Sequence, residues 1–128
     1  MSSVRIIRVL LADNHEILRR SLINALAIFE DIKLVGEADN GLEAVRLCAV
    51  LEPDVAVMAL RLPGLDGVSA TRLIREQFPQ TRVVILTSSL LEEDVTGALQ
   101  AGAVAYLRKD VSIDGIVRAI REAIDVPV

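Results

Sequence analysis

Four side chains that could take part in phosphate or cation chemistry stand just after apolar runs of this sequence. They are Asp13, Asn14, Thr87 and Lys109. If the runs are strands of a parallel sheet, their carboxyl ends meet along one edge, and that edge is where ligands of open α/β sheets bind. An acid, an amide, a hydroxyl and an amine gathered there could bind a phosphate group or a hydrated cation. Each residue alone also has a plain structural explanation, so the interpretation depends on the set.

The central apolar run of the chain lacks such a group. It begins at Asp54, continues through Ala59 and breaks at the turn sequence Leu-Pro-Gly at 62–64. An apolar run of this length between turn residues predicts a strand buried on both faces. At the carboxyl end of that strand Ala59 supplies neither a nucleophile nor a metal ligand.

Strands and helices are expected to alternate along the whole chain. The predicted strands cover 6–12, 33–38, the run that begins at Asp54, 82–86 and 103–107, and the predicted helices cover 15–29, 42–51, 67–78, 91–101 and 112–124. Asn14 and Asp66 are expected to cap the helices that follow them, and Gly102 to terminate the helix before it. Five strands alternating with five helices predict an α/β fold, with a parallel sheet covered by helices on both faces.

Composition limits the classes of function. A chain of 128 residues is one domain, 1–128, and its net charge of −4 with only 2% aromatic residues argues against nucleic-acid binding by this segment. The single cysteine excludes an internal disulfide and fits a cytoplasmic location. We find neither a secretory signal nor a membrane span, and we expect a soluble protein.

Several motifs together resemble the receiver domain of bacterial two-component response regulators. They are Ala12-Asp13-Asn14-His15, Met58-Ala59-Leu60 followed by Leu62-Pro63-Gly64-Leu65-Asp66-Gly67, Leu86-Thr87-Ser88, and Tyr106-Leu107-Arg108-Lys109-Asp110. The similarity extends from Ile6 to Ile124, and the phrases are most similar to NarL/FixJ-type transcriptional regulators. The resemblance implies a doubly wound, flavodoxin-like receiver fold with strand order 2-1-3-4-5.

The resemblance also implies a mechanism. In the family, an aspartate at the position of Ala59 accepts a phosphoryl group from a histidine kinase. The acidic pair at 13–14 and the backbone carbonyl of the residue at Arg61 hold Mg²⁺. Thr87, Tyr106 and Lys109 occupy the positions that sense the phosphoryl group, after which the surface of the fourth helix and fifth strand changes. The domain would regulate rather than catalyse, so we do not expect an enzyme.

This sequence departs from the family pattern at two positions of the site. Ala59 cannot be phosphorylated, and Asn14 replaces the second acid with a neutral, weaker ligand, so we expect magnesium binding to be weak or absent. Lys109 loses its usual carboxylate partner, and we expect it to contact Asp13 directly. His15 lies beside the site and is expected to be solvated, since the chain has no second histidine to share a metal.

Alternatives remain open for the origin of Ala59 and for the function. The chain could be a natural pseudo-receiver, which we favour, or a receiver in which the acceptor aspartate was deliberately replaced by alanine. A small-molecule-binding flavodoxin-like domain and a stand-alone protein-interaction domain are the competing functions.

The expected partners follow from the same resemblance. They are a histidine kinase, a C-terminal helix-turn-helix output domain outside this chain, and a second copy bound through a face formed by Leu90, Leu91 and Val95.

Overall fold

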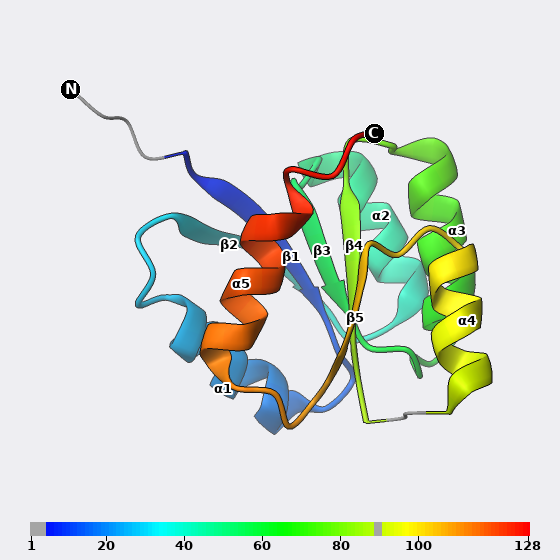
Figure 1. Cartoon of the computed structure of the whole chain (residues 1–128), viewed down its shortest axis with the longest axis horizontal. Helices are drawn as coiled ribbons and strands as arrows, with labels where there is room; N and C mark the ends of the chain where they lie inside the picture. The colour runs from blue at the N-terminus through cyan, green and yellow to red at the C-terminus, as the bar shows by residue number, and fades with distance from the viewer. Residues whose placement is uncertain (1–4, 89–90) are drawn as a thin grey trace.

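The computed structural model describes residues 5–88 and 91–128, and within them five strands alternate with five helices (Figure 1). The strands are β1 (Ile7–Ala12), β2 (Ile32–Ala38), β3 (Val55–Met58), β4 (Arg82–Thr87) and β5 (Ala105–Arg108). The helices are α1 (Glu16–Leu26), α2 (Gly41–Leu51), α3 (Gly67–Gln77), α4 (Glu92–Gln100) and α5 (Ile113–Ala123). The expected alternation of elements is confirmed.

The strands form one parallel sheet in the order β2-β1-β3-β4-β5, as the family resemblance implied. Ala12 of β1 is in register with Met58 of β3, which in turn is in register with Ile85 of β4. The carboxyl ends of β1, β3 and β4 therefore lie at one level, and in Figure 1 they meet at the lower edge of the sheet. The residues that follow these strands are brought together there.

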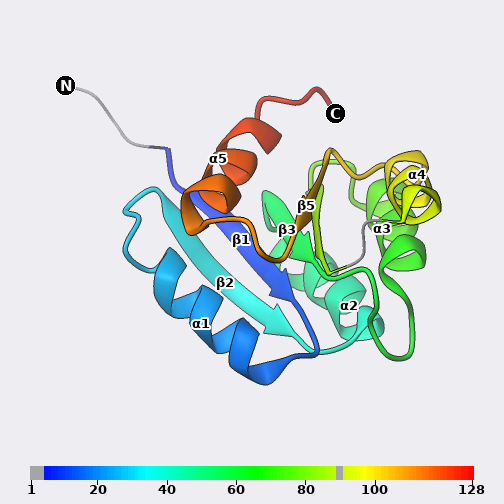
Figure 2. The same cartoon turned by 60° about the horizontal axis from the view of Figure 1, so that its bottom comes forward.

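Helices cover both faces of the sheet, with α1 and α5 on one side and α2, α3 and α4 on the other (Figures 1 and 2). Each face has its own aliphatic core. One core contains Val9, Val57 and Ile120, and the other contains Leu10, Ile74 and Ile85. Burial of each such side chain stabilises the fold by about 1.5–3 kcal/mol, so the sheet is a rigid support for the residues at its edge.

Local chemistry explains several helix boundaries. The Asp66 carboxylate accepts a hydrogen bond from the backbone N–H of Ser69, which confirms the predicted cap of α3. Asn40 caps α2 and Ser112 caps α5 in the same way. Gly102, with φ of +111°, ends α4 as expected, because a glycine adopts this left-handed conformation without steric cost.

Three expectations about element boundaries are wrong. Asn14 does not cap α1; the N-cap position is His15, which makes no side-chain capping bond and whose backbone N–H donates to the Asp13 carboxylate. Helix α1 stops at Leu26 and not at Phe29, and β5 begins at Ala105 and not at Ala103. The Ala103 N–H still bonds to the Ala98 carbonyl, so this residue closes the end of α4 before the strand starts.

Candidate functional site

Asp13 is the centre of the polar cluster at the carboxyl edge of the sheet. It follows β1 and is buried, with 2% of its side chain exposed. Its Oδ1 atom accepts a hydrogen bond from the His15 backbone N–H at 2.8 Å, and its Oδ2 atom lies 2.9 Å from Nζ of Lys109. The imidazole Nδ1 of His15 lies 3.1 Å from Oδ1. Both carboxylate oxygens are therefore already engaged by groups of this chain.

Lys109 reaches this carboxylate from the segment after β5. Its backbone N–H donates to the Thr87 carbonyl at 2.8 Å, which fixes the start of the side chain beside β4. Only 16% of the side chain is exposed, and the ammonium group also lies 3.3 Å from Nδ1 of His15. The expected contact between Lys109 and Asp13 is confirmed.

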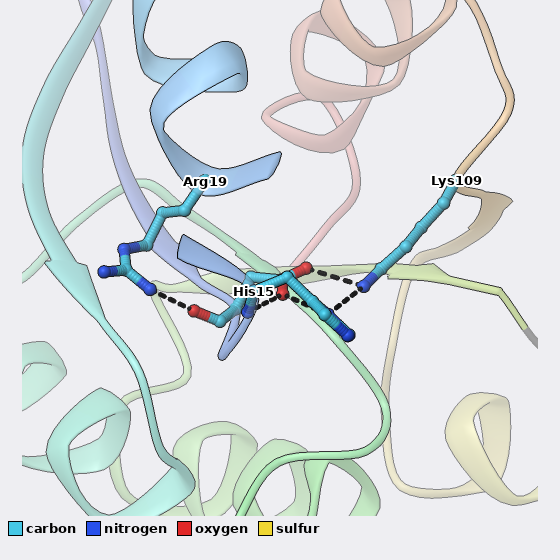
Figure 3. Close-up of polar contacts among 4 residues, drawn as sticks. His15, Arg19 and Lys109 are labelled. Atoms are coloured by element: carbon cyan, nitrogen blue, oxygen red, sulfur yellow. Dashed lines mark hydrogen bonds and ion pairs between the residues drawn. The ribbon is translucent and has the colours of Figure 1, made fainter. Parts of the chain in front are cut away.

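Arg19 contacts Asp13 from the side opposite to Lys109. The sequence analysis did not predict this contact. The Nη1 atom of Arg19 donates to the Asp13 backbone carbonyl at 2.6 Å, and its Nε atom donates to the Glu37 carboxylate at 2.8 Å. Figure 3 shows Arg19 and Lys109 approaching from opposite sides, one from α1 and the other from the segment after β5. The Glu37–Arg19 pair thus ties the loop after β1 to the edge strand β2.

Ala59 lies at the end of β3, between the loops that carry Asp13 and Thr87. It is buried, and its backbone N–H donates to the Ala12 carbonyl at 2.9 Å, which continues the pairing of β1 with β3. Gly67 packs against this point so closely that a Cβ there would lie 2.4 Å from the Ala59 carbonyl oxygen. The first residue of α3 is therefore in close contact with the residue that follows β3. The side chain of that residue, Ala59, is a methyl group.

The remaining predicted switch residues lie on the neighbouring strands. Thr87 ends β4 and is buried, while Tyr106 on β5 is half-buried against the core beneath α2, α3 and α4. Both side chains lie on the half of the sheet next to α4. The structure therefore places Thr87 and Lys109 close together through the backbone hydrogen bond between them, with Tyr106 three residues before Lys109.

Asn14 and Arg61 do not join the Asp13 cluster by any side-chain contact. Both are exposed, and they line an open hollow of about 510 Å³ between the loop after β3 and α4. The guanidinium of Arg61 lies 3.6 Å from the Asp94 carboxylate on α4, so this ion pair crosses the rim of the hollow. Exposed pairs of this kind contribute little to stability.

Magnesium fits this arrangement poorly. A hard cation needs oxygen ligands that are not already neutralised, and both Asp13 oxygens are held by Lys109 and His15. Ala59 contributes no side-chain oxygen, and no cluster of three or more acidic, histidine or cysteine side chains with metal-binding geometry occurs among the side chains of residues 5–88, 91 and 93–128. Across the same residues, every buried side-chain nitrogen or oxygen already has a hydrogen-bond partner. Among the described side chains, this edge of the sheet therefore offers Mg²⁺ no free set of oxygen ligands.

The single cysteine takes no part in the site. Cys48 lies on the inner side of α2 and is fully buried among aliphatic side chains. Burial disfavours the thiolate and raises the pKa of this thiol to about 12. Cys48 is therefore a packing residue, as its neighbours in the core indicate.

Comparison with known proteins decides the family. The family model for the response regulator receiver domain matches residues 9–121. This chain belongs to the response regulator receiver domain family. It is 41% identical over 117 residues to the transcriptional regulatory protein LiaR of Bacillus subtilis, covering 91% of this chain and 56% of LiaR. It is 35% identical over 123 residues to the nitrate/nitrite response regulator NarL of Escherichia coli, covering 96% of this chain and 57% of NarL.

A solved receiver domain shows the same fold in detail. The signal receiver domain of the putative response regulator NarL from Mycobacterium tuberculosis superposes with a TM-score of 0.92 at 32% identity, over 96% of this chain and 99% of that one. The curated relatives are about twice as long, so this chain spans about half their length. Within the described residues, none of the helices has the length and apolar character that crossing a membrane would require.

Proposed function

We propose that this receiver domain signals without phosphorylation at position 59. The proposal is supported by the residue that follows β3: this residue is Ala59, and the family resemblance implies that it stands at the position of the acceptor aspartate. A methyl group has no lone pair with which to attack phosphorus. The domain would then act through binding and not as an enzyme.

The Lys109–Asp13 ion pair supports a site whose charges are balanced without a metal ion or a phosphoryl group. Lys109 crosses the carboxyl ends of β4 and β3 to reach a carboxylate after β1, and the 2.9 Å contact neutralises the only buried acid there. In this arrangement the ammonium group provides the positive charge that Mg²⁺ provides elsewhere in the family. We infer that the site holds one arrangement whether or not a metal or phosphoryl donor is present.

The same reasoning favours a natural pseudo-receiver. Asn14 is a second loss from the metal site, and its exposed side chain has left the cluster. An investigator who wished only to block phosphorylation would replace the acceptor and leave Asn14 alone. Deliberate replacement of an aspartate by Ala59 is the alternative, and the sequence of the source gene at this codon distinguishes the two.

A magnesium titration tests this reading of the site. We expect the melting temperature of the chain to stay constant as MgCl₂ is raised through the millimolar range. The matched control is the double variant Ala59→Asp with Asn14→Asp, which regains two carboxylates and should gain stability with Mg²⁺, by about 4 °C for each kcal/mol of binding linkage. A rise in the melting temperature of the unmodified chain equal to that of the double variant would overturn the proposal.

We further propose that the domain associates with a second copy through α4. Leu91 is 54% exposed before the first turn of α4 and Leu99 is 49% exposed in its last turn, while Val95 lies between them and is half-buried. Spacings of four residues place all three on one face of the helix. Leu90, which the sequence also assigned to this face, lies outside the described residues, and Leu99 is an addition that the sequence analysis missed.

Sedimentation measurements test this face. Leu99→Glu should shift a concentration-dependent dimer to monomer, because it puts a charge into an apolar contact. Val50→Glu on α2 is the control, since Val50 is similarly exposed but lies on another helix. If the unmodified chain stays monomeric at every concentration, or if both variants weaken association equally, the α4 face is not the dimer interface.

The other expected partners belong to the whole protein. Because the curated relatives named as transcriptional regulators are about twice as long, we propose that a C-terminal helix-turn-helix output domain follows this domain and makes the DNA contacts. A histidine kinase would be a docking partner and not a phosphoryl donor to position 59. We place the protein in the cytoplasm.

A further inference from the structure

His15 lies at the solvent-exposed edge of the Asp13 cluster, where contacts with Asp13 orient its imidazole ring. It precedes α1, and 67% of its side chain is exposed. The buried Asp13 Oδ1 atom accepts the His15 backbone N–H at 2.8 Å and lies 3.1 Å from the ring atom Nδ1. One carboxylate oxygen therefore fixes both the backbone and the ring of the single histidine in the chain.

This contact favours the tautomer with the proton on Nδ1. A carboxylate oxygen at 3.1 Å is a strong acceptor for Nδ1–H and would repel a lone pair placed there. Lys109 lies 3.3 Å from the same atom, but its shorter contact, at 2.9 Å, is with Oδ2 of Asp13. With the proton on Nδ1, the lone pair lies on Nε2, and both ring contacts found among the described side chains are made by Nδ1.

We propose that Nε2 of His15 is a phosphoryl acceptor. The donor class is a compound with a reactive phosphorus bond to nitrogen, such as phosphoramidate or a phosphohistidine of a partner protein. The Nε2 lone pair forms the new N–P bond while the P–N bond of the donor breaks, and the donor nitrogen, which is already protonated, leaves with that electron pair as neutral ammonia or a neutral imidazole. The positive charge that develops on the imidazole faces the Asp13 carboxylate, an arrangement of nucleophile and orienting acid that activates histidines in general.

The surrounding charges suit the product. The phosphoryl group would bring negative charge next to a site whose single buried carboxylate is already neutralised by Lys109. The Lys109 ammonium lies 3.3 Å from Nδ1, so a cation is close to the ring. The inference goes beyond the proposed function, because it concerns a different atom and holds whatever the role of position 59.

Phosphorylation by phosphoramidate tests the inference directly. The chain is incubated with potassium phosphoramidate, and intact mass and ³¹P NMR detect one added phosphoryl group. We expect a label that is stable in alkali and lost in acid, which is the behaviour of phosphohistidine, whereas an aspartyl phosphate is lost in alkali. Labelling should exceed that of N-acetylhistidine under the same conditions by at least about tenfold, because the Asp13 carboxylate holds the ring in the reactive tautomer.

Two variants test whether the label is on His15 and whether Asp13 promotes it. His15→Gln should remain folded, because the side chain is mostly exposed, and should take up no alkali-stable label. Asp13→Asn should slow labelling at least about tenfold, since the amide no longer favours the Nδ1–H tautomer, with circular dichroism confirming that it is folded. Labelling of the chain no faster than N-acetylhistidine, or equal labelling of His15→Gln, would overturn the inference without bearing on position 59.

Discussion

The Nζ atom of Lys109 lies 2.9 Å from Oδ2 of Asp13, so residues that follow the first and the last strand of the chain form one ion pair. Strands β1 and β5 are separated in the sheet by β3 and β4, and the lysine side chain crosses the ends of both. The lysine side chain passes the end of β3, where the buried residue Ala59 has only a methyl group. The pair therefore joins the two ends of the sheet edge across a strand that ends without a side-chain oxygen.

Loss of Lys109 should destabilise the domain. In Lys109→Met, the Asp13 carboxylate stays buried with one oxygen unpaired, and we expect the free energy of unfolding to fall by about 2 kcal/mol. Urea unfolding followed by circular dichroism measures this change. Lys33→Met on β2 is the control, because Lys33 is exposed and its loss should cost less than about 0.5 kcal/mol. Equal effects of the two substitutions would show that the ion pair contributes nothing.

The ion pair between Arg121 and Asp31 should make stability depend on pH. Two hydrogen bonds of 2.8 and 2.9 Å join the guanidinium to the carboxylate, and they hold the pKa of Asp31 below its ordinary value. A carboxyl group with a lowered pKa in the folded state adds stability above its unfolded pKa, near pH 4, and loses it as the pH falls through the folded value.

Arg121→Gln should remove this contribution. We expect the variant to be less stable than the parent at neutral pH and the difference to shrink as the pH falls below about 4. NMR titration should show the pKa of Asp31 rising in the variant. Arg118→Gln, on the same helix, should leave that pKa unchanged. A stability difference that stays constant with pH would contradict the assignment.

Two glycines should respond to alanine in opposite directions. In Gly67→Ala, the new methyl group would lie 2.4 Å from the Ala59 carbonyl oxygen, and we expect a loss of about 1–3 kcal/mol. In Gly97→Ala, the nearest atom would be Cγ2 of Val68 at 3.9 Å, so the change should stabilise α4 by about 0.5–1 kcal/mol. Thermal unfolding of the two variants measures both. Stabilisation by Gly67→Ala would mean that α3 can move away from β3.

Most of the fold could be predicted from the sequence because its signals are local. Alternating apolar runs and helical periodicity located all ten elements, and Asp66 and Gly102 marked boundaries through their own chemistry. The cap of α1 was mispredicted because Asp13 competes with Asn14 for the same turn, and its carboxylate takes the His15 N–H. Which of two adjacent polar residues turns inward is decided by partners elsewhere in the fold.

The candidate site was predictable only in part. The strand-end rule brought Asp13, Thr87 and Lys109 together, and the family resemblance, which implies a carboxylate partner for the lysine at position 59, suggested that Lys109 would turn to Asp13 instead. The support from Arg19 was not foreseen, because it depends on a backbone carbonyl and on Glu37 of a different strand. The contact between His15 and Lys109 likewise joins residues 94 positions apart, which no local pattern encodes.

The central claim is that Ala59 removes the acceptor of this receiver domain, and intact-mass analysis after incubation with acetyl phosphate and Mg²⁺ tests it most directly. All proteins carry His15→Gln, so that the histidine takes no part, and alkali treatment identifies an aspartyl phosphate. We predict that the protein with Ala59 stays unlabelled and that Ala59→Asp with Asn14→Asp gains one alkali-labile phosphoryl group. An alkali-labile label on the protein with Ala59, or none on the restored variant, would contradict the account.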